Sequence, residues 1–524
     1  MPRFIPTCYQ QDIFIALNLE NQLQSGTFEH ALHYLIEHKL DLSIFHHNYK
    51  NKDTGRRAYN PAVLLKVILF AYSKGITSSR EIEWCCANNI IFKALSCDSV
   101  PHFTTIADFI SRSPEDIEAV FEQILLVCHQ QGLLGNELFA IDGCKMPSDA
   151  SKSRSGTFKE LKEKRDKLKK LIKHTMKKHK EIDEEELDGS ERKQRKEQTI
   201  QTLEQEHDKI VEFLDNNEPR KGHGKRKTEV KSNITDNESA KMTTSKGTIQ
   251  GFVGVGTADN KHQIITDAQA FGSGQEHHLL QPVLQTIASR YQKLGISDNI
   301  YSTGIIVTAD TGYANEGNMQ YLHDNQINAY IPDNQFRSRD PKFADQKEKH
   351  GTRHERRPAR KTSKEIPAED FNFDPNKKSC ICPSGHNMRL KKSATDKDGN
   401  EKQYFEGRLS DCRNCSIKKQ CMRNPNSADK ANGSGRQVSF ITKKSPRKPN
   451  YTDWMKGRID TDRGREIYGH RMSVIEPVFA NIESNKGLKR FSLRGKAKVQ
   501  GQWQLYCLVH NIEKLKNYGN LAIQ

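Results

Sequence analysis

The chain has 524 residues, enough for two to four domains of about 100 to 200 residues each. Its 83 lysines and arginines exceed its 66 aspartates and glutamates, and the net charge of +17 favours nucleic acid as a partner, with a merely well-solvated surface as the alternative. The apolar run at 61–72 is too short for a membrane span, and no export signal opens the chain. We therefore expect a cytoplasmic protein without a membrane partner.

Residues 1–135 are predicted to form a helical domain. Apolar residues recur at helical spacing in three segments, 28–36, 61–73 and 117–129. Between the last two, serines and threonines precede short helices expected at 81–89 and 106–111. Two capped helices joined by turns are compatible with a DNA-reading helix-turn-helix, although an ordinary helical subdomain has the same pattern.

Short apolar runs dominate residues 136–334 and predict a mixed α/β core. Five strands are expected, at 138–141, 252–258, 263–271, 304–309 and 328–332. A hairpin turn is expected at 259–261, and helices at 279–294 and 316–324. Residues 451–524 are predicted to complete this core with a helix at 462–485.

Two insertions interrupt the predicted core. The first, at 151–232, is rich in lysine and glutamate, and its sparse apolar residues fall on stripes that predict a helical hairpin with a break at 188–190. The hairpin would serve as an arm or dimer contact, with a solvated charge run as the alternative, and its basic end at 220–227 suits phosphate contacts. The second insertion, at 335–450, is polar and contains five cysteines.

These clustered cysteines predict a structural zinc site. The expected ligands are Cys382, Cys412, Cys415 and Cys421, because tetrahedral Zn²⁺ commonly closes small loop-rich segments and the CxxC pair at 412–415 has the usual spacing. Cys380 and His386 are alternative ligands. Reduced free thiols are the other interpretation, since nothing indicates an oxidising compartment.

Two aspartates follow apolar strands and are the first candidates for catalysis. Asp142 follows the run at 138–141, and Asp310 follows the run at 305–309; each acid is expected at a strand end beside a glycine-containing turn. Two-metal phosphodiester cleavage needs carboxylates that converge on ions about 3.5 to 4 Å apart. Rigid strand ends are suited to holding such ligands.

A third carboxylate is expected from the helix at 462–485. Its predicted buried stripe is Met472, Ile475, Phe479 and Ile482. Glu476 adjoins this stripe and would reach the two aspartates through tertiary structure.

Three motifs together resemble bacterial insertion-sequence DDE transposases, the group with an InsH-like helical N-terminal domain and a Tyr/Arg/Glu signature helix. They read AIDG at 140–143, ADTGY at 309–313, and YGHR at 468–471 followed by IEPVF at 475–479. The resemblance spans nearly the whole chain. It implies an RNase H-like core, Mg²⁺ or Mn²⁺ dependence, binding of terminal inverted repeats, strand cleavage and joining to target DNA.

Residue by residue, the resemblance implies that Asp142, Asp310 and Glu476 hold the metal ions and that Tyr468 and Arg471 contact DNA. A guanidinium pairs well with phosphate and neutralises charge that develops on it. The sequence departs from the family pattern at two points. Arg471 lies five rather than four residues before the glutamate, and the lysine usual seven residues after it is Glu483 here, with Lys486 as a substitute. Pro477 is expected to kink the helix and turn Arg471 toward the site.

The leading hypothesis is therefore an active, nucleoid-associated bacterial transposase that acts as a homodimer on double-stranded DNA, at its inverted repeats and its target. An inactive transposase-derived DNA-binding protein is the alternative, and intact carboxylates disfavour it. A zinc-stabilised scaffold would bind metal and DNA independently of the three acids. A plain nuclease would cut DNA without joining it.

Overall fold

The computed structural model describes residues 18–49, 57–183, 190–222, 227–245, 247–343, 365–396, 399–444 and 450–520. The chain divides into two compact units, one formed by residues 1–334 and 454–524 and the other by residues 335–453. Within the described ranges, no helix is both long enough and apolar enough to cross a membrane.

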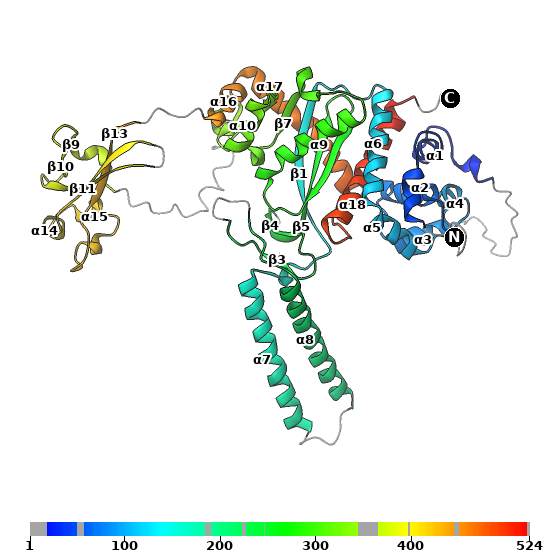
Figure 1. Ribbon diagram of the computed structural model, residues 1–524, viewed down its shortest axis with the longest axis horizontal. Coiled ribbons are helices and arrows are strands. Elements are labelled where there is room, and N and C mark those ends of the chain that lie inside the picture. The colour runs from blue at the N-terminus through cyan, green and yellow to red at the C-terminus, as the bar shows by residue number, and fades with distance from the viewer. Residues whose placement is uncertain are drawn as a thin grey trace, which may run out of the picture. The chain divides into compact units, whose positions relative to one another are not determined.

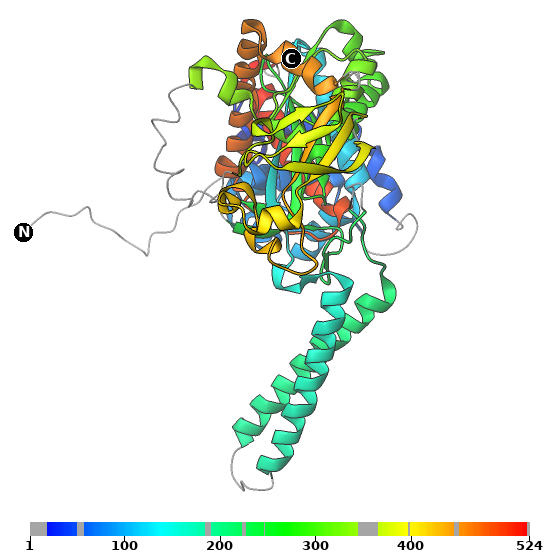
Figure 2. The ribbon, with the colours of Figure 1, turned by 90° about the vertical axis from the view of Figure 1, so that its left-hand side faces the viewer.

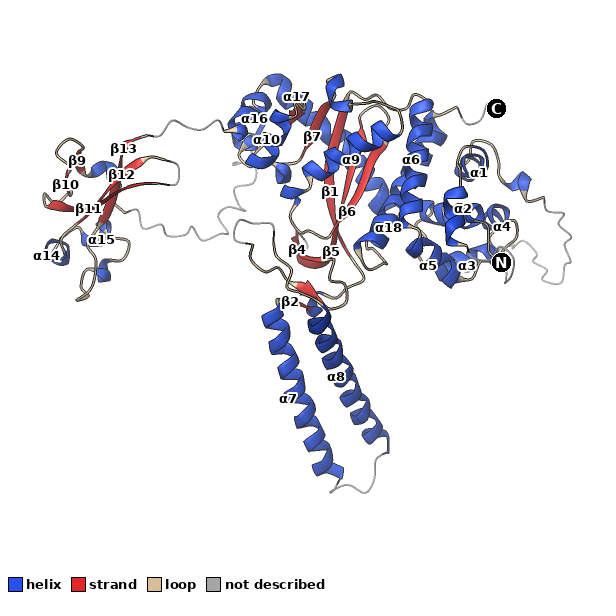
Figure 3. Ribbon diagram, viewed as in Figure 1, coloured by secondary structure: helices blue, strands red, loops and turns tan. Residues whose placement is uncertain are grey.

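The N-terminal part is helical, as predicted (Figure 3). Its elements are η1 (Glu20–Gln22), α1 (Phe28–His38), η2 (Ser43–Asn48), α2 (Pro61–Ser73), α3 (Ser79–Asn88), α4 (Ile90–Ser96), α5 (Phe103–Arg112) and α6 (Pro114–Gln130). The Asn60 side chain caps α2 by accepting from the Ala62 N–H, and Pro61 stands at the first helical position. The helix α4 was not predicted, and it separates α3 from α5. The two predicted DNA-reading helices are therefore not consecutive.

A mixed sheet forms the centre of the first unit (Figure 1). Its strands are β4 (Ala240–Thr244), β5 (Gly247–Asp259), β1 (Leu138–Pro147), β7 (Ile306–Ala309) and β8 (Ala329–Tyr330) in that order, with β6 (Ile265–Phe271) also paired to β5. The strands β1, β7 and β8 run parallel, while β5 is antiparallel to β1, β4 and β6. All five predicted strands and the hairpin turn after Asp259 are confirmed, and β4 is an additional strand.

Helices flank this sheet on both faces. They are α9 (Leu280–Lys293), η5 (Ile300–Thr303), α10 (Glu316–Asp324), α16 (Tyr451–Ile459), α17 (Asp462–Ala480) and α18 (Lys496–Tyr518). The helix α17 contacts β1, β5 and β7, whereas α18 packs against β6, α2 and α6. Gln500 and Asn511 of α18 pair with the backbone of β6, where Asn511 accepts from the Ile265 N–H at 2.8 Å. These side chains satisfy polar groups that an edge strand would otherwise leave unpaired.

The predicted helical hairpin is present as α7 (Phe158–Asp183) and α8 (Ser190–Asn216), which lie side by side (Figure 2). The short paired strands β2 (Ser155–Gly156) and β3 (Ser232–Asn233) join its two ends, and η3 (Lys152–Arg154) precedes β2. The contact between the helices is buried near these strands, at Phe158, Leu161, Leu168, Ile210 and Phe213. Farther along, Met176 of the predicted stripe is 42% exposed. The predicted break at 188–190 falls largely outside the described residues.

The basic end of this hairpin differs from expectation at Arg220. Its guanidinium donates to the backbone carbonyls of Asn237, Ser239 and Gly272, so it holds the loop instead of facing a phosphate. Residues 223–226 of the basic run lie outside the described ranges.

The second unit is an antiparallel sheet that the sequence did not predict. Its strands, in the order β13-β12-β11-β10-β9, are β13 (Gln437–Lys443), β12 (Glu401–Glu406), β11 (Asn387–Thr395), β10 (Ser379–Ile381) and β9 (Asn372–Asp374). Its short helices are α11 (Phe336–Arg339), η7 (Pro341–Phe343), η8 (Ala368–Asp370), α14 (Leu409–Arg413), α15 (Lys418–Cys421) and η9 (Pro425–Ser427). Its small core is built from Phe371, Cys380, Met388, Phe405, Cys421 and Val438.

Candidate active site

Asp142 and Asp310 lie on neighbouring parallel strands. Ile141 of β1 pairs with Ala309 of β7, so the following residue of each strand is one of the two acids. Asp310 directly follows β7 and precedes η6 (Thr311–Tyr313), as predicted. Asp142 does not end its strand, contrary to the prediction. Its long antiparallel partner β5 keeps pairing with β1 as far as Pro147.

The helix α17 directs Arg471 and Tyr468 at these two acids. Arg471 Nη1 donates to Asp142 Oδ2 at 3.0 Å, and Tyr468 Oη donates to Asp310 Oδ1 at 3.4 Å. The two side chains are three residues apart, which places them on one face of a helix. Arg471 is only 5% exposed. The structure thus brings together four of the five residues expected at the active site.

Burial controls the charges of the Asp142–Arg471 pair. Burial raises the pKa of Asp142, and the charge of Asp310 adds to the rise, while Arg471 and the Gly143 N–H partly oppose it. Burial also disfavours the Arg471 cation, but the neighbouring carboxylates outweigh it and raise the pKa of Arg471. Arg471 therefore remains a cation beside a carboxylate that water solvates poorly.

Glu476 does not join the two aspartates in this structure. Its side chain is exposed, and within the described residues it has no hydrogen bond or ion pair. Five residues separate it from Arg471, which turns it about 140° around the helix from the face that meets Asp142. The prediction that Met472 is buried is also wrong, because its side chain is 48% exposed. Arg471 and Ile475 lie on the buried face of the helix instead.

Pro477 lies inside α17 and leaves one backbone carbonyl of the helix without its usual donor. It cannot donate to the Ser473 carbonyl, which instead accepts from Gln263 Nε2 at 3.0 Å. The helix continues to Ala480 and then into a π-helical turn, Asn481–Asn485. Lys486, the suggested substitute for the family lysine, is 6% exposed and pairs with Glu513 and the Ser73 carbonyl, so it is not placed to contact DNA.

Three residues that the sequence did not single out surround the two aspartates. Glu276 of η4 (Glu276–His278) lies with its Oε1 3.6 Å from Nζ of Lys145, which is on β1. Tyr313 is fully buried, and burial followed by the charges of Glu276, Asp142 and Asp310 raises its pKa well above the usual value. The sequence carried no signal for Glu276, because its position depends on β6 running parallel to β1, which brings the end of β6 to the same sheet edge as Asp310.

The four predicted zinc ligands surround one small cavity in the second unit. Cys382, Cys412, Cys415 and Cys421 all line it, and its volume is about 30 Å³. Burial raises the pKa of both Cys412 and Cys421, and the other thiols add to each rise. His386 also lines this cavity, whereas Cys380 is buried in the core beside Met388.

No set of three metal-binding side chains is already in coordinating geometry within the described ranges, in either unit. The oxygens of Asp142 and Asp310 are nevertheless the donor type that Mg²⁺ and Mn²⁺ prefer. Thiolates are the donor type that Zn²⁺ prefers.

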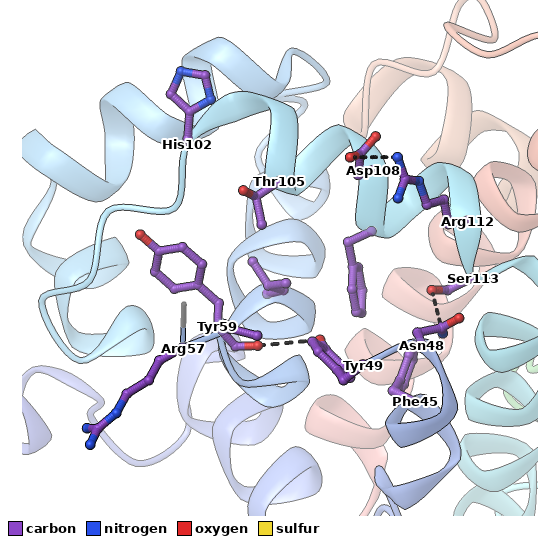
Figure 4. Close-up of a pocket in the computed structure, with 13 residues that line it drawn as sticks. Phe45, Asn48, Tyr49, Arg57, Tyr59, His102, Thr105, Asp108, Arg112 and Ser113 are labelled. Carbon is purple, nitrogen blue, oxygen red and sulfur yellow. Dashed lines mark hydrogen bonds and ion pairs between the residues drawn. The ribbon is translucent and has the colours of Figure 1, made fainter. Parts of the chain in front are cut away.

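An open pocket of about 410 Å³ lies in the helical N-terminal part (Figure 4). Its lining combines aromatic and cationic side chains, among them Tyr49, Tyr59, Arg57 and Arg112. Tyr49 Oη donates to the Tyr59 carbonyl at 3.4 Å, and Arg112 pairs with Asp108 at 3.2 Å. Arg112 is still largely exposed, so part of its charge faces solvent.

Two family models match the chain. Residues 381–516 match a transposase DDE domain, and residues 17–112 match a transposase domain, DUF772. The first match contains Glu476, Arg471 and the zinc-ligand candidates, while Asp142 and Asp310 lie outside it. No curated protein and no solved structure matches the chain.

The matches define a class: a DDE domain implies a transposase-type nuclease or transferase, and such proteins act on DNA. Together the two matches support an insertion-sequence DDE transposase, in agreement with the resemblance given by the motifs.

Proposed function

We propose that the chain binds the terminal inverted repeats of its own insertion sequence, cleaves the DNA strands there and joins them to target DNA. The sheet order β6-β5-β1-β7-β8, with β1, β7 and β8 parallel and β5 reversed, supports an RNase H-like core. The observation that carries the proposal is the placement of Asp142 and Asp310 side by side, facing Arg471 and Tyr468 of the signature helix.

Asp142, Asp310 and Glu476 are the proposed ligands of two Mg²⁺ or Mn²⁺ ions. The fit rests on hard oxygen donors at one sheet edge and on the buried Tyr313 hydroxyl, which lacks a hydrogen-bond partner within the described part of the chain. When bound, such ions activate water and stabilise the leaving oxygen. Glu476 would complete the set by a rotation of this part of α17 when metal or DNA binds, because it lies about 140° around the helix from Arg471.

Arg471 and Tyr468 would act on the DNA phosphate. Arg471 neutralises Asp142 in the protein alone, and a guanidinium can exchange a carboxylate for a phosphate with the same bidentate geometry. Tyr468 already donates a hydrogen bond and can donate to a phosphate oxygen in the same way. Both residues would thereby stabilise charge that develops during strand cleavage.

The helical N-terminal part is the proposed reader of the inverted repeats. Exposed cations and aromatics near α3 and α5, including Arg57, Arg112 and the 63% exposed Trp84, are the residue types that contact phosphates and bases. A homodimer on DNA follows from the need to hold two element ends for coupled joining. Binding to DNA would place the protein at the bacterial nucleoid, in the cytoplasm.

The second unit is proposed to hold one structural Zn²⁺ through Cys382, Cys412, Cys415 and Cys421. The four thiols meet around one cavity although they come from separate loops and short helices. Zinc would order this unit as a DNA-facing module and take no part in cleavage.

The test incubates purified protein with labelled DNA that carries both element ends, with and without Mn²⁺ or Mg²⁺. We expect cleavage and joining by the wild type, and DNA binding without cleavage by Asp310→Asn and Glu476→Gln. Glu483→Gln is the matched control, because Glu483 is an exposed acid seven residues farther along the same helical segment.

Three other outcomes of this experiment would each support a different interpretation. Binding without cleavage by the wild type would support the inactive DNA-binding derivative, and cleavage without joining would support a plain nuclease. If Glu483→Gln abolishes cleavage and Glu476→Gln does not, the third ligand has been assigned to the wrong glutamate.

A further inference from the structure

Glu276 lies close to both segments that carry the two aspartates, β1 and the turn after β7. It follows β6 and begins η4, and its side chain is 16% exposed. Its Oε1 is 3.6 Å from Nζ of Lys145, which is three residues after Asp142 on β1. The contact is an ion pair that is slightly longer than an ordinary hydrogen bond.

The other carboxylate oxygen of Glu276 faces the loop after Asp310. A Cβ atom at Gly312 would lie 2.6 Å from Glu276 Oε2, a separation that real side chains do not adopt. Glycine at this position therefore makes room for the carboxylate. Glu276 consequently touches the segment that follows Asp310 as well as the side chain of Lys145 on the Asp142 strand.

Tyr313 supplies a second, independent observation. Its side chain is fully buried, and its hydroxyl has no hydrogen-bond partner within the described residues. The hydroxyl lies 3.3 Å from the point that a Cβ atom would occupy if Gly143, the neighbour of Asp142, carried a side chain. Buried hydroxyls are normally satisfied, so one left open beside three carboxylates indicates a missing polar ligand.

The charges of Asp142 and Asp310 also act on Glu276. Burial raises the pKa of Glu276, Lys145 opposes the rise, and the charges of Asp142 and Asp310 add to it. Among the described residues, Lys145 and Arg471 are the cations that pair with these three acids, so negative charge is in excess at the sheet edge and favours a divalent cation.

We propose that Glu276 is a further metal-coordinating carboxylate of this site, with Lys145 as its counter-ion in the protein alone and Tyr313 as donor to a metal-bound water. The inference rests on the proposed function and extends its ligand set. Glu276 approaches from the face of the sheet that carries Lys145 and Gly143, whereas α17 and Arg471 cover the face that carries Asp142.

The experiment measures Mn²⁺ binding to metal-free full-length protein, without DNA, by the electron paramagnetic resonance signal of free Mn²⁺. We expect Glu276→Gln to weaken binding about tenfold. Lys145→Met should strengthen it about threefold, because a competing cation is removed. Glu206→Gln is the matched control: it breaks another glutamate–lysine pair, with Lys164 at 3.1 Å in the hairpin, and should leave binding unchanged.

The opposite signs separate ligation from a structural ion pair. If Glu276→Gln and Lys145→Met both weaken binding, the pair only positions the loop and the inference is overturned. If Asp310→Asn weakens binding while Glu276→Gln leaves it unchanged, the inference fails and the proposed function stands. If neither variant changes binding, both fail. Where Glu276→Gln does not fold, Lys145→Met still tests the inference, because weaker Mn²⁺ binding by that variant overturns it.

Discussion

The two proposed metal sites are built in different ways. Asp142 and Asp310 are set beside each other by the backbone pairing of β1 with β7, and Arg471 already neutralises one of them. The four thiols of the second unit come from loops and short helices, and side-chain contacts such as Ser384 Oγ to Cys415 Sγ at 3.2 Å link segments about them that are 31 residues apart in the chain. A carboxylate site of this kind can exist without metal, whereas a thiol site of this kind depends on it.

The first prediction tests that dependence and has the largest expected effect. Cys412→Ser should remove the bound zinc and unfold the second unit, because zinc binding supplies about 10 kcal/mol or more to such small folds. Zinc content by atomic absorption and limited proteolysis at 365–444 would measure it. Cys97→Ser, an exposed cysteine in the first unit, is the control. A protease-resistant second unit in zinc-free protein would contradict the comparison.

The second prediction concerns the carboxylates. Asp310→Asn should lower the rate of strand cleavage by at least about 10³-fold and leave the free energy of unfolding nearly unchanged. The reason is that the amide removes a metal ligand but its oxygen can still accept the hydrogen bond from Tyr468. Gel-based cleavage and thermal unfolding give the two readouts. A large fall in stability would show that this site, like the thiol site, is needed for folding.

The sequence predicted those parts of the carboxylate site that depend on a single strand, and not those that depend on how the strands pair. An acid that follows a short apolar run is predicted to lie at or near a strand end, and this pattern identified Asp142 and Asp310. The sequence could not show that β1 continues past Asp142, because that depends on its pairing with β5. Glu276 was missed for the same reason, since its place at the edge requires the order of the strands.

In the helix that carries Glu476 and in the second unit, the pattern of apolar residues did not predict the structure correctly. Hydrophobic periodicity placed Met472 inside and did not foresee that Arg471 would be buried, because an ion pair with Asp142 holds it there. The strands of the second unit were missed because their residues are mostly polar, as in β11, where only Met388 is buried. The cysteine spacing still identified the four thiols that share a cavity.

The third prediction concerns Arg471, the buried cation that pairs with Asp142 in the carboxylate site. Arg471→Gln should lower cleavage about 10- to 100-fold, because a donor to the phosphate is lost. It should also tighten Mn²⁺ binding, because Arg471 no longer competes for Asp142. Arg463→Gln, an exposed change on the same helix, should do neither. Weaker Mn²⁺ binding by Arg471→Gln would mean that the arginine positions Asp142 for the metal.

The smallest expected effect is a pH dependence confined to the first unit. Burial lowers the pKa of His510 to about 4, and this ring lies beside Asn481 at the end of α17, with its Nδ1 3.0 Å from Asn481 Nδ2. Because the unfolded chain takes up the proton near pH 6.5 and the folded chain does not, stability falls as the pH drops. Between pH 6.5 and 5.5 the loss from this group is about 1 kcal/mol.

Urea unfolding of wild type and His510→Gln at the two pH values would isolate this contribution. The variant should be less stable at pH 6.5 and lose about 1 kcal/mol less than the wild type on acidification. Unfolding of the second unit, followed separately by its zinc content, should not respond to the substitution, because His510 belongs to the first unit. If the substitution changes zinc retention, the carboxylate and thiol sites are coupled and the comparison between two independent metal sites no longer holds.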